Sequence, residues 1–149
     1  MSKIVDIKAQ LIDLIETNLT GYLRLPNPYS VTENTYLHLS KGYGLFVGPG
    51  FDTERYTGCI VTWERDFTLI LVNQMTATDN DTLKRESIEN ALLEDHDIMR
   101  KIIYKESPLG GIAIKSTVVN DQGINFIDAD QLKFLSLQMT ITVEYQDIL

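Results

Sequence analysis

Near the end of the chain, apolar and polar residues alternate without a break from Leu135 to Tyr145. Successive side chains of a strand point to opposite faces, so this pattern predicts a strand with one buried and one wet face. A second alternation runs from Cys59 to Val72, and its later half is apolar on both sides. It predicts a central strand covered on both faces, either continuous or divided by a bend at 64–66. Together these two runs commit the chain to a β-sheet.

Two other stretches carry a helical period instead. Ile4, Ile7, Leu11 and Leu14 recur at helical spacing, and Gly21 stands where such a helix would end. The second stretch covers residues 83–105, after several N-cap candidates at 79–82. Its predicted buried face consists of Ile88, Ala91, Leu92, Asp95, Ile98, Met99 and Ile102.

Glycine and proline divide the remaining sequence into predicted loops and turns. One long loop is expected at about 24–35, which holds Pro26 and Pro28, and another at 48–58, which begins with Gly-Pro-Gly. The polar run from Asn120 to Gly123 predicts a turn between two strands. The order of elements is therefore a helix, two or three strands, a helix, and two or three more strands.

This order, with short links between consecutive strands, favours an α+β two-layer sandwich. Its sheet would be mainly antiparallel, with about 4–6 strands and two helices on one face. The 149 residues are 44% hydrophobic and 23% charged, which are ordinary globular values. A single domain spanning 1–149 is the expected organisation.

The composition argues against several classes of function. The net charge is −8, and no basic run extends beyond two residues, so the chain is not expected to grip nucleic acid. No run of 18 apolar residues exists, so no membrane-spanning helix is expected. The sequence has no phosphate-binding glycine loop, nucleophile elbow or zinc-protease motif, which favours a protein that is not an enzyme and needs no cofactor.

The reactive side chains also favour structural roles. His96 stands among Glu94, Asp95 and Asp97, but four consecutive helical residues fan around the axis and cannot converge on one metal ion. A solvated helix face is the prediction for this cluster, and no metal site is expected. The single cysteine, Cys59, lies in an apolar strand pattern and is predicted to be a buried, inert thiol.

The predicted strands are longer than the expected diameter of the domain. A compact chain of this size has a radius of gyration of about 15 Å and hence a diameter of about 38 Å. A strand over 134–145 would be about 40 Å long, and one over 59–72 about 46 Å. Such strands curl strongly or project, and projecting edges need a partner. Together with exposed-looking loop residues, this gives a candidate interface of Pro28, Tyr29, Pro49, Phe51, Arg55 and Tyr56.

In the order of its predicted elements and in the residue patterns of its segments, the chain resembles the tail terminator, or tail-completion, family of long-tailed bacteriophages. The resemblance is carried by the segments IVDIKAQLIDLIE, FTLILVN, ALLEDHDIM and LSLQMTITVEY. It implies a structural virion protein that forms a homo-oligomeric, hexameric ring at the head-proximal end of the tail. The ring would cap the tail tube, end its polymerisation and present an interface for head joining.

The resemblance also implies the partners and the location. These are the tail tube protein, a head or neck completion protein, and DNA that passes through the lumen without specific binding; no membrane is involved. The protein would assemble in the host cytoplasm and remain in the virion. Three alternatives stay open: another head-tail neck or head-closure protein, a general α+β protein-interaction module, and a small hydrolase or ligand-binding domain, which would need a pocket where His38 or His96 meets carboxylates.

Overall fold

The computed structural model describes residues 3–24, 41–75, 82–106, 109–111, 113–129 and 132–148. Within these residues two helices and five strands follow one another along the chain. They are α1 (Lys3–Asn18), β1 (Leu23–Arg24), β2 (Lys41–Thr57), β3 (Ile60–Met75), α2 (Thr82–Lys105), β4 (Lys115–Ala129) and β5 (Leu132–Ile148). The sheet order is β1-β2-β3-β5-β4.

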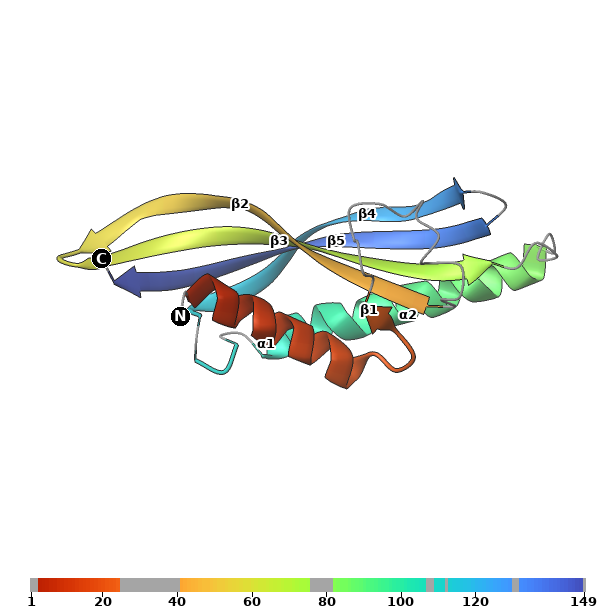
Figure 1. The fold of residues 1–149 in the computed structure, drawn as a ribbon, viewed down its shortest axis with the longest axis horizontal. Coiled ribbons are helices and arrows are strands. Elements are labelled where there is room, and N and C mark those ends of the chain that lie inside the picture. Colours follow the sequence, from red (N-terminus) through yellow and green to blue (C-terminus); the bar gives the residue numbers. More distant parts are fainter. Residues whose placement is uncertain are drawn as a thin grey trace.

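Both helices lie on one face of a long, twisted sheet (Figure 1). Every described strand pair is antiparallel except β1 with β2, which is parallel and only two residues long. The predicted α+β architecture is therefore confirmed. No helix among the described residues is long and apolar enough to cross a membrane.

The core lies between the helices and the central strands β3 and β5. Phe67 pairs with Ile141 and Leu71 with Leu137, and all four side chains are almost completely buried. Cross-strand partners share a face, so these residues form one apolar surface under the helices. The buried face predicted from Leu135 to Tyr145 is confirmed, because its six apolar members are all buried. The wet face predicted opposite it is wrong, because Ser136 and Glu144 are buried and the three polar residues between them are half-buried.

The helices supply the other half of this core. In α1 the buried residues are Ile7, Leu11, Leu14 and Ile15, as the helical period predicts. In α2 the buried line is Leu92, His96, Met99 and Ile103, which is rotated from the predicted face. Ile98, expected in the core, is exposed, and the prediction of a solvated His96 is wrong because that ring lies under the helix.

Two tyrosines near the β1–β2 edge bind the helices through carboxylates. The Tyr22 hydroxyl donates to Asp95 Oδ2 on α2 at 2.8 Å, and the Tyr43 hydroxyl donates to Glu16 Oε1 on α1 at 2.6 Å. Burial, and then the hydrogen bond to the carboxylate, raises the pKa of both phenols. Asp95 is therefore a hydrogen-bond acceptor on the inner side of α2, which accounts for a polar residue within its apolar period.

Two predicted interruptions of the sheet are wrong. The loop expected at 48–58 is strand: β2 continues to Thr57, with register irregularities after Val47 and after Asp52. The turn expected from Asn120 to Gly123 lies inside β4, where the ladder also shifts register. Gly123 has a φ of 73° there, and its N–H donates to Asp121 Oδ1 at 2.9 Å.

Both errors have the same physical origin. Glycine and proline are tolerated in an edge strand at a bulge, where a missing N–H or a positive φ does not break the ladder. Signals that mark loops in a central strand therefore mark bulges in an edge strand. Of the other predicted loop, 24–35, only Arg24 is described, and it lies in β1; the remainder lies outside the described residues.

Substituting Leu137→Asp is expected to unfold the protein. The side chain is buried between the sheet and the helices, so the substitution places an unpaired charge in the core. The expected loss of unfolding free energy is at least about 3 kcal/mol, measured by urea denaturation. The matched control, Gln146→Asp on an exposed position of the same strand, should change stability by less than about 0.5 kcal/mol. A Leu137→Asp protein as stable as the control would contradict this packing.

His96 is expected to make stability depend on pH. Burial lowers the pKa of its imidazole, opposed by the carboxylate of Asp121 on β4 and that of Asp97, and assisted by Arg100. Its Nε2 is buried and has no hydrogen-bond partner. The unfolded chain therefore binds this proton at a higher pH than the fold does. The free energy of unfolding should therefore lose nothing to His96 above the ordinary histidine pKa of about 6.5. It should fall as the pH drops below that value, because the unfolded chain then binds the proton first.

The measurement is the urea midpoint at about pH 7.5 and about pH 5 for the parent and for His96→Gln. The parent should lose more stability between the two conditions than the variant loses. Equal pH dependence of the two proteins would show that His96 is not the group responsible.

Candidate assembly interface

The sheet is longer than the helix layer, and three strands extend past the N-terminal end of α1 (Figure 1). We call this extension the arm: residues 48–57 of β2, residues 60–66 of β3 and residues 144–148 of β5. The expectation that long strands project beyond the packed domain is met here. The N-terminal end of α1 lies at the base of the arm, where Lys3 Nζ donates to the backbone carbonyl of Gln146 at 2.7 Å.

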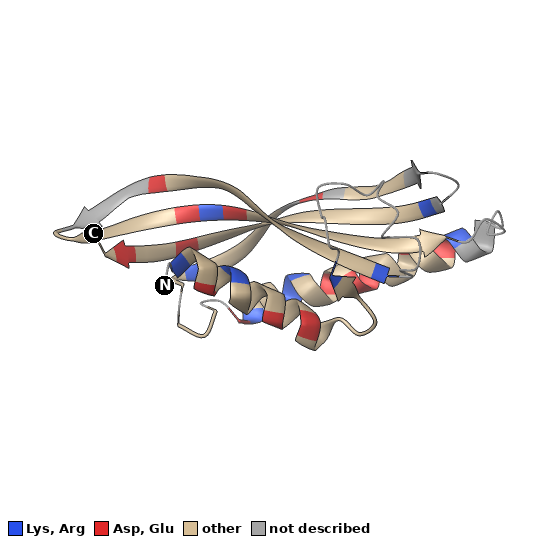
Figure 2. Cartoon of the chain, in the orientation of Figure 1, with Lys and Arg blue, Asp and Glu red and all other residues tan. Residues whose placement is uncertain are grey.

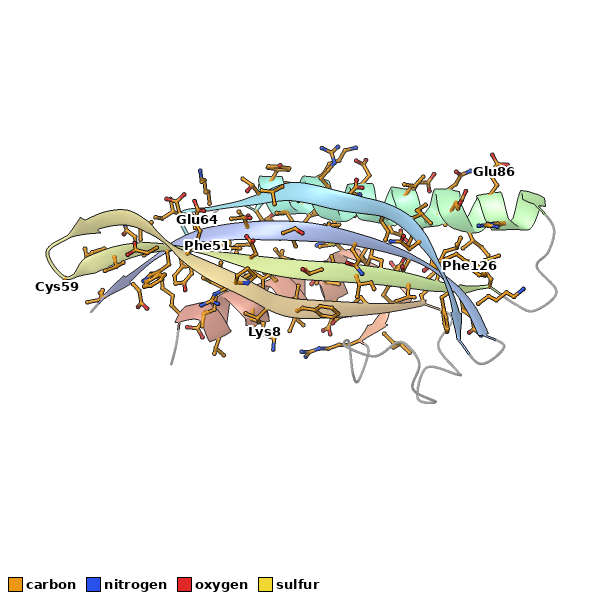
Figure 3. The ribbon with its side chains drawn as sticks, turned by 90° about the horizontal axis from the view of Figure 1, so that it is seen from above. Lys8, Phe51, Cys59, Glu64, Glu86 and Phe126 are labelled. Atoms are coloured by element: carbon orange, nitrogen blue, oxygen red, sulfur yellow. The ribbon has the colours of Figure 1, made fainter. Side chains whose placement is uncertain are left out.

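The tip of the arm is a two-residue turn, Gly58–Cys59, between paired Thr57 and Ile60. Gly58 has a φ of 62°. A glycine at the first position of such a turn matches the twist of the flanking strands. Cys59 is consequently exposed at the tip (Figure 3), so the predicted buried thiol is wrong. Its place in a turn, and not in the strand that follows, is the reason.

At the base of the arm, Arg65 holds the first bulge of β2. Its Nη1 donates to the carbonyl of Gly48 at 3.1 Å. A Cβ at Gly50 would lie only 2.6 Å from the Arg65 Cζ, so a glycine is needed for the guanidinium to sit there. The Gly-Pro-Gly sequence thus lets the edge strand bend around a charged side chain from its neighbour.

Further polar contacts tie β3 to β5 and β5 to β4 at the same level. Thr142 Oγ1 donates to Asp66 Oδ1 at 2.7 Å, and the Lys115 Nζ lies 3.4 Å from Glu144 Oε2. Charged residues cross the strands in this region (Figure 2). The base of the arm is therefore polar, whereas the body of the sheet is apolar under the helices. The arm is joined to the body by directional contacts and by the continuous β3–β5 ladder.

The arm is bordered on each side by an edge strand of the described sheet. The parallel pairing of β1 ends at Arg24 with Tyr43, so among the described strands β2 is the outermost from Gly44 onward. On the other side, the pairing of β4 begins at Lys115 with Glu144, so no described strand pairs with that side of β5 from Tyr145 to Ile148, where Lys3 of α1 donates to the Gln146 carbonyl. Edge strands present backbone groups that can pair with another chain.

Exposed apolar side chains gather on one face of the arm. Phe51 pairs with Glu64, and Ile60 pairs with Ile148. Because β3 has a regular register with β5, Ile60 and Glu64 point away from the helix side that Phe67 occupies. Phe51, Ile60 and Ile148 therefore share the outer face, with exposures of 52%, 40% and 78%. Phe51 and Glu64 are seen close together along the arm in Figure 3.

The predicted interface residues are only partly united by the structure. Pro49 and Phe51 are exposed on β2 in the arm. The backbones of Arg55 and Tyr56 lie in the same strand, but their side chains are outside the described part. Pro28 and Tyr29 also lie outside it. Sequence reasoning missed Ile60 and Ile148, although Ile148 continues the polar side of the closing alternation and could have been recognised as an exposed isoleucine.

Outside the arm, the described residues offer little for catalysis. No group of three or more histidine, cysteine, aspartate or glutamate side chains among them could hold a metal ion. An open hollow of about 400 Å³ lies along α2, lined by Glu86, Ser87, Asn90, Ala91 and Glu94. Its two carboxylates are eight positions apart, roughly 12 Å along the helix, which is too far for them to act on one bond.

No protein-family model matches the chain, and comparison with curated proteins finds no match.

Replacing Gly50 with alanine is expected to displace Arg65. The added Cβ occupies the position of the guanidinium, so the hydrogen bond to Gly48 is lost. The expected cost is about 1 kcal/mol of unfolding free energy by urea denaturation. In an Arg65→Ala background the same Gly50→Ala substitution should cost less than about 0.5 kcal/mol, because nothing remains to be displaced. Equal costs in both backgrounds would contradict the contact.

Proposed function

We propose that this chain is a structural virion protein that forms a six-fold ring on the head-proximal end of a phage tail tube. The ring ends polymerisation of the tube and presents the surface to which the head is joined. The observation that carries the proposal is the arm, which projects from the packed domain with an edge strand on each side. A surface that can give and accept a contact on opposite sides generates a closed ring when the rotation closes.

The exposed apolar residues of the arm support an assembly role. Phe51 and Ile148 are more than half exposed on its outer face. Exposed apolar groups gathered on one surface and rimmed by polar groups are typical of sites that bind another protein. Glu64, Asp66 and Lys115 supply that polar surrounding at the base of the arm.

The charge of the chain suits the passage of DNA. The net charge is −8, with 21 acidic residues against 13 basic ones. A surface of this sign gains little from counterion release and would not hold the DNA backbone. In this proposal the ring contacts the tail tube protein on one side and a head or neck completion protein on the other. It has no catalytic role, needs no cofactor, and is built into the virion after assembly in the host cytoplasm.

The purified protein is expected to form six-fold rings, alone or on tail tubes. Native mass spectrometry gives the number of copies, and negative-stain electron microscopy of the protein with tail tubes shows whether a ring sits at the tube end. Phe51→Asp should abolish the rings and leave a folded monomer, because it places a charge on the apolar face of the arm. The matched control is Leu93→Asp, at a similarly exposed position (48%) on α2, which should still form rings.

The other outcomes separate the alternatives. A protein that stays monomeric even with tail tubes present would overturn the proposal. Binding to head-side partners without binding to the tube would identify a head-closure protein instead. Rings that survive Phe51→Asp but not Leu93→Asp would move the interface from the arm to the helices.

A further inference from the structure

The C-terminal end of α2 carries a basic surface, although the chain as a whole has a net charge of −8. Between Asp97 and Glu106 the helix has three basic residues and no acidic one (Figure 2). Arg100 and Lys101, whose side chains are 47% and 68% exposed, both pair with Asp97, so one carboxylate serves two cations. Lys105 is exposed and forms no ion pair with another described residue. Positive charge therefore remains available at this end of the helix.

Exposed apolar side chains lie beside these basic residues. The Tyr104 hydroxyl donates to the carbonyl of Val118 at 2.9 Å, which places the tyrosine ring along β4. Tyr104 is 47% exposed, and Val119, the next residue of β4, is 59% exposed. We call this surface the shoulder: it consists of Arg100, Lys101, Tyr104, Lys105 and Val119. It combines apolar groups with an excess of positive charge, which suits an acidic partner that also presents apolar side chains.

We infer that the shoulder of each copy receives the arm of a neighbouring copy. This inference rests on the proposed ring and specifies which two surfaces meet in it. The arm has the complementary composition, because Phe51 is exposed on its outer face opposite Glu64. The described side chains of the arm include one basic residue, Arg65, and five acidic ones: Asp52, Glu64, Asp66, Glu144 and Asp147. Opposite charges across an interface speed the encounter and exclude wrong partners.

The arm does not reach the shoulder of its own chain. It extends past the N-terminal end of α1, whereas the shoulder lies on the C-terminal end of α2, within the helix layer (Figure 1). Glu64 also points away from the helix side, which Phe67 occupies. Each copy therefore carries two different surfaces that can meet only between copies, and a heterologous contact of this kind can close into a ring. Leu93, about 16 Å along α2 from Tyr104, lies outside the shoulder.

A charge swap in the full chain tests this contact. Glu64→Lys reverses a charge of the arm, and Lys105→Glu reverses one of the shoulder. Each variant alone should need at least about tenfold more protein for half-assembly into rings, because like charges then meet. An equimolar mixture should assemble at the concentration of the parent, since each reversed arm meets a reversed shoulder and each original arm meets an original shoulder. With one variant isotopically labelled, native mass spectrometry should find equal numbers of the two variants in each ring.

The controls place the same charge changes elsewhere. Arg24→Glu lies at an exposed position of β1, and Glu86→Lys lies at an exposed position of α2. Each should form rings at the concentration of the parent. Mixed with Glu64→Lys, the Arg24→Glu chains should form rings that exclude the other variant. The Glu86→Lys chains should do the same when they are mixed with Lys105→Glu.

A photo-cross-link locates the contact without any change of charge. Phe51 is replaced by the photoreactive analogue p-benzoylphenylalanine, and rings are assembled from isotopically labelled and unlabelled chains. Irradiation should join residue 51 to segment 98–106 or segment 114–119 of a different copy. Mass spectrometry of the digested product identifies both the segment and the copy to which it belongs.

The outcomes separate this inference from the function on which it rests. Urea denaturation first verifies that each variant is folded; where one is not, the photo-cross-link decides. Rings formed by both single variants at the concentration of the parent would overturn the contact and leave the ring intact. So would single variants that mixing does not restore, or cross-links from residue 51 to other segments. Absence of rings from the unsubstituted protein, alone and with tail tubes, would overturn both the ring and the contact.

Discussion

The long ladder between β3 and β5 is the interaction on which the rest of the structure depends. It runs without a register shift from Ile60 with Ile148 to Met75 with Lys133. Under the helices it supplies the apolar floor of the core, and among the described strands of the arm it is the ladder without a register shift. The ladders on either side each contain two register shifts. The regular central ladder makes the middle of the sheet a rigid support. The register shifts in the two outer ladders make the outer strands poor templates for unselective pairing with other chains.

Sequence patterns predicted the central parts of this fold well. A period of two from Leu135 to Tyr145 and helical periods in 4–15 and 83–105 reflect burial on one side of an element, which is a local property. The edge strands were harder to predict, because Gly-Pro-Gly at 48–50 and the polar run at 120–123 have the composition of loops. Their inclusion in strands depends on which neighbour they pair with, and this is a non-local property that no short window contains.

The candidate interface was predicted in part for the same reason. Pro49 and Phe51 were recognised as surface residues, but as members of a loop and not of a projecting strand. Ile148 was missed because the part it plays depends on where the pairing of β4 stops. In α2, His96 shows where sequence-based prediction of burial fails. A histidine among three acidic residues has the composition of a solvent-exposed surface, yet the rotation of α2 on the sheet buries its ring. Rotation about a helix axis by less than one residue spacing decides such cases.

The position of β5 between β3 and β4 has a consequence for how the protein is made. β5 follows every other described element in the sequence, yet it occupies an inner place in the sheet. During synthesis on the ribosome, β3 and β4 are made before β5. The edges of β3 and β4 that pair with β5 therefore stay unpaired until β5 has been translated. Such a sheet is closed by contacts between distant parts of the chain, which form slowly. The arm therefore becomes complete only after translation has reached β5.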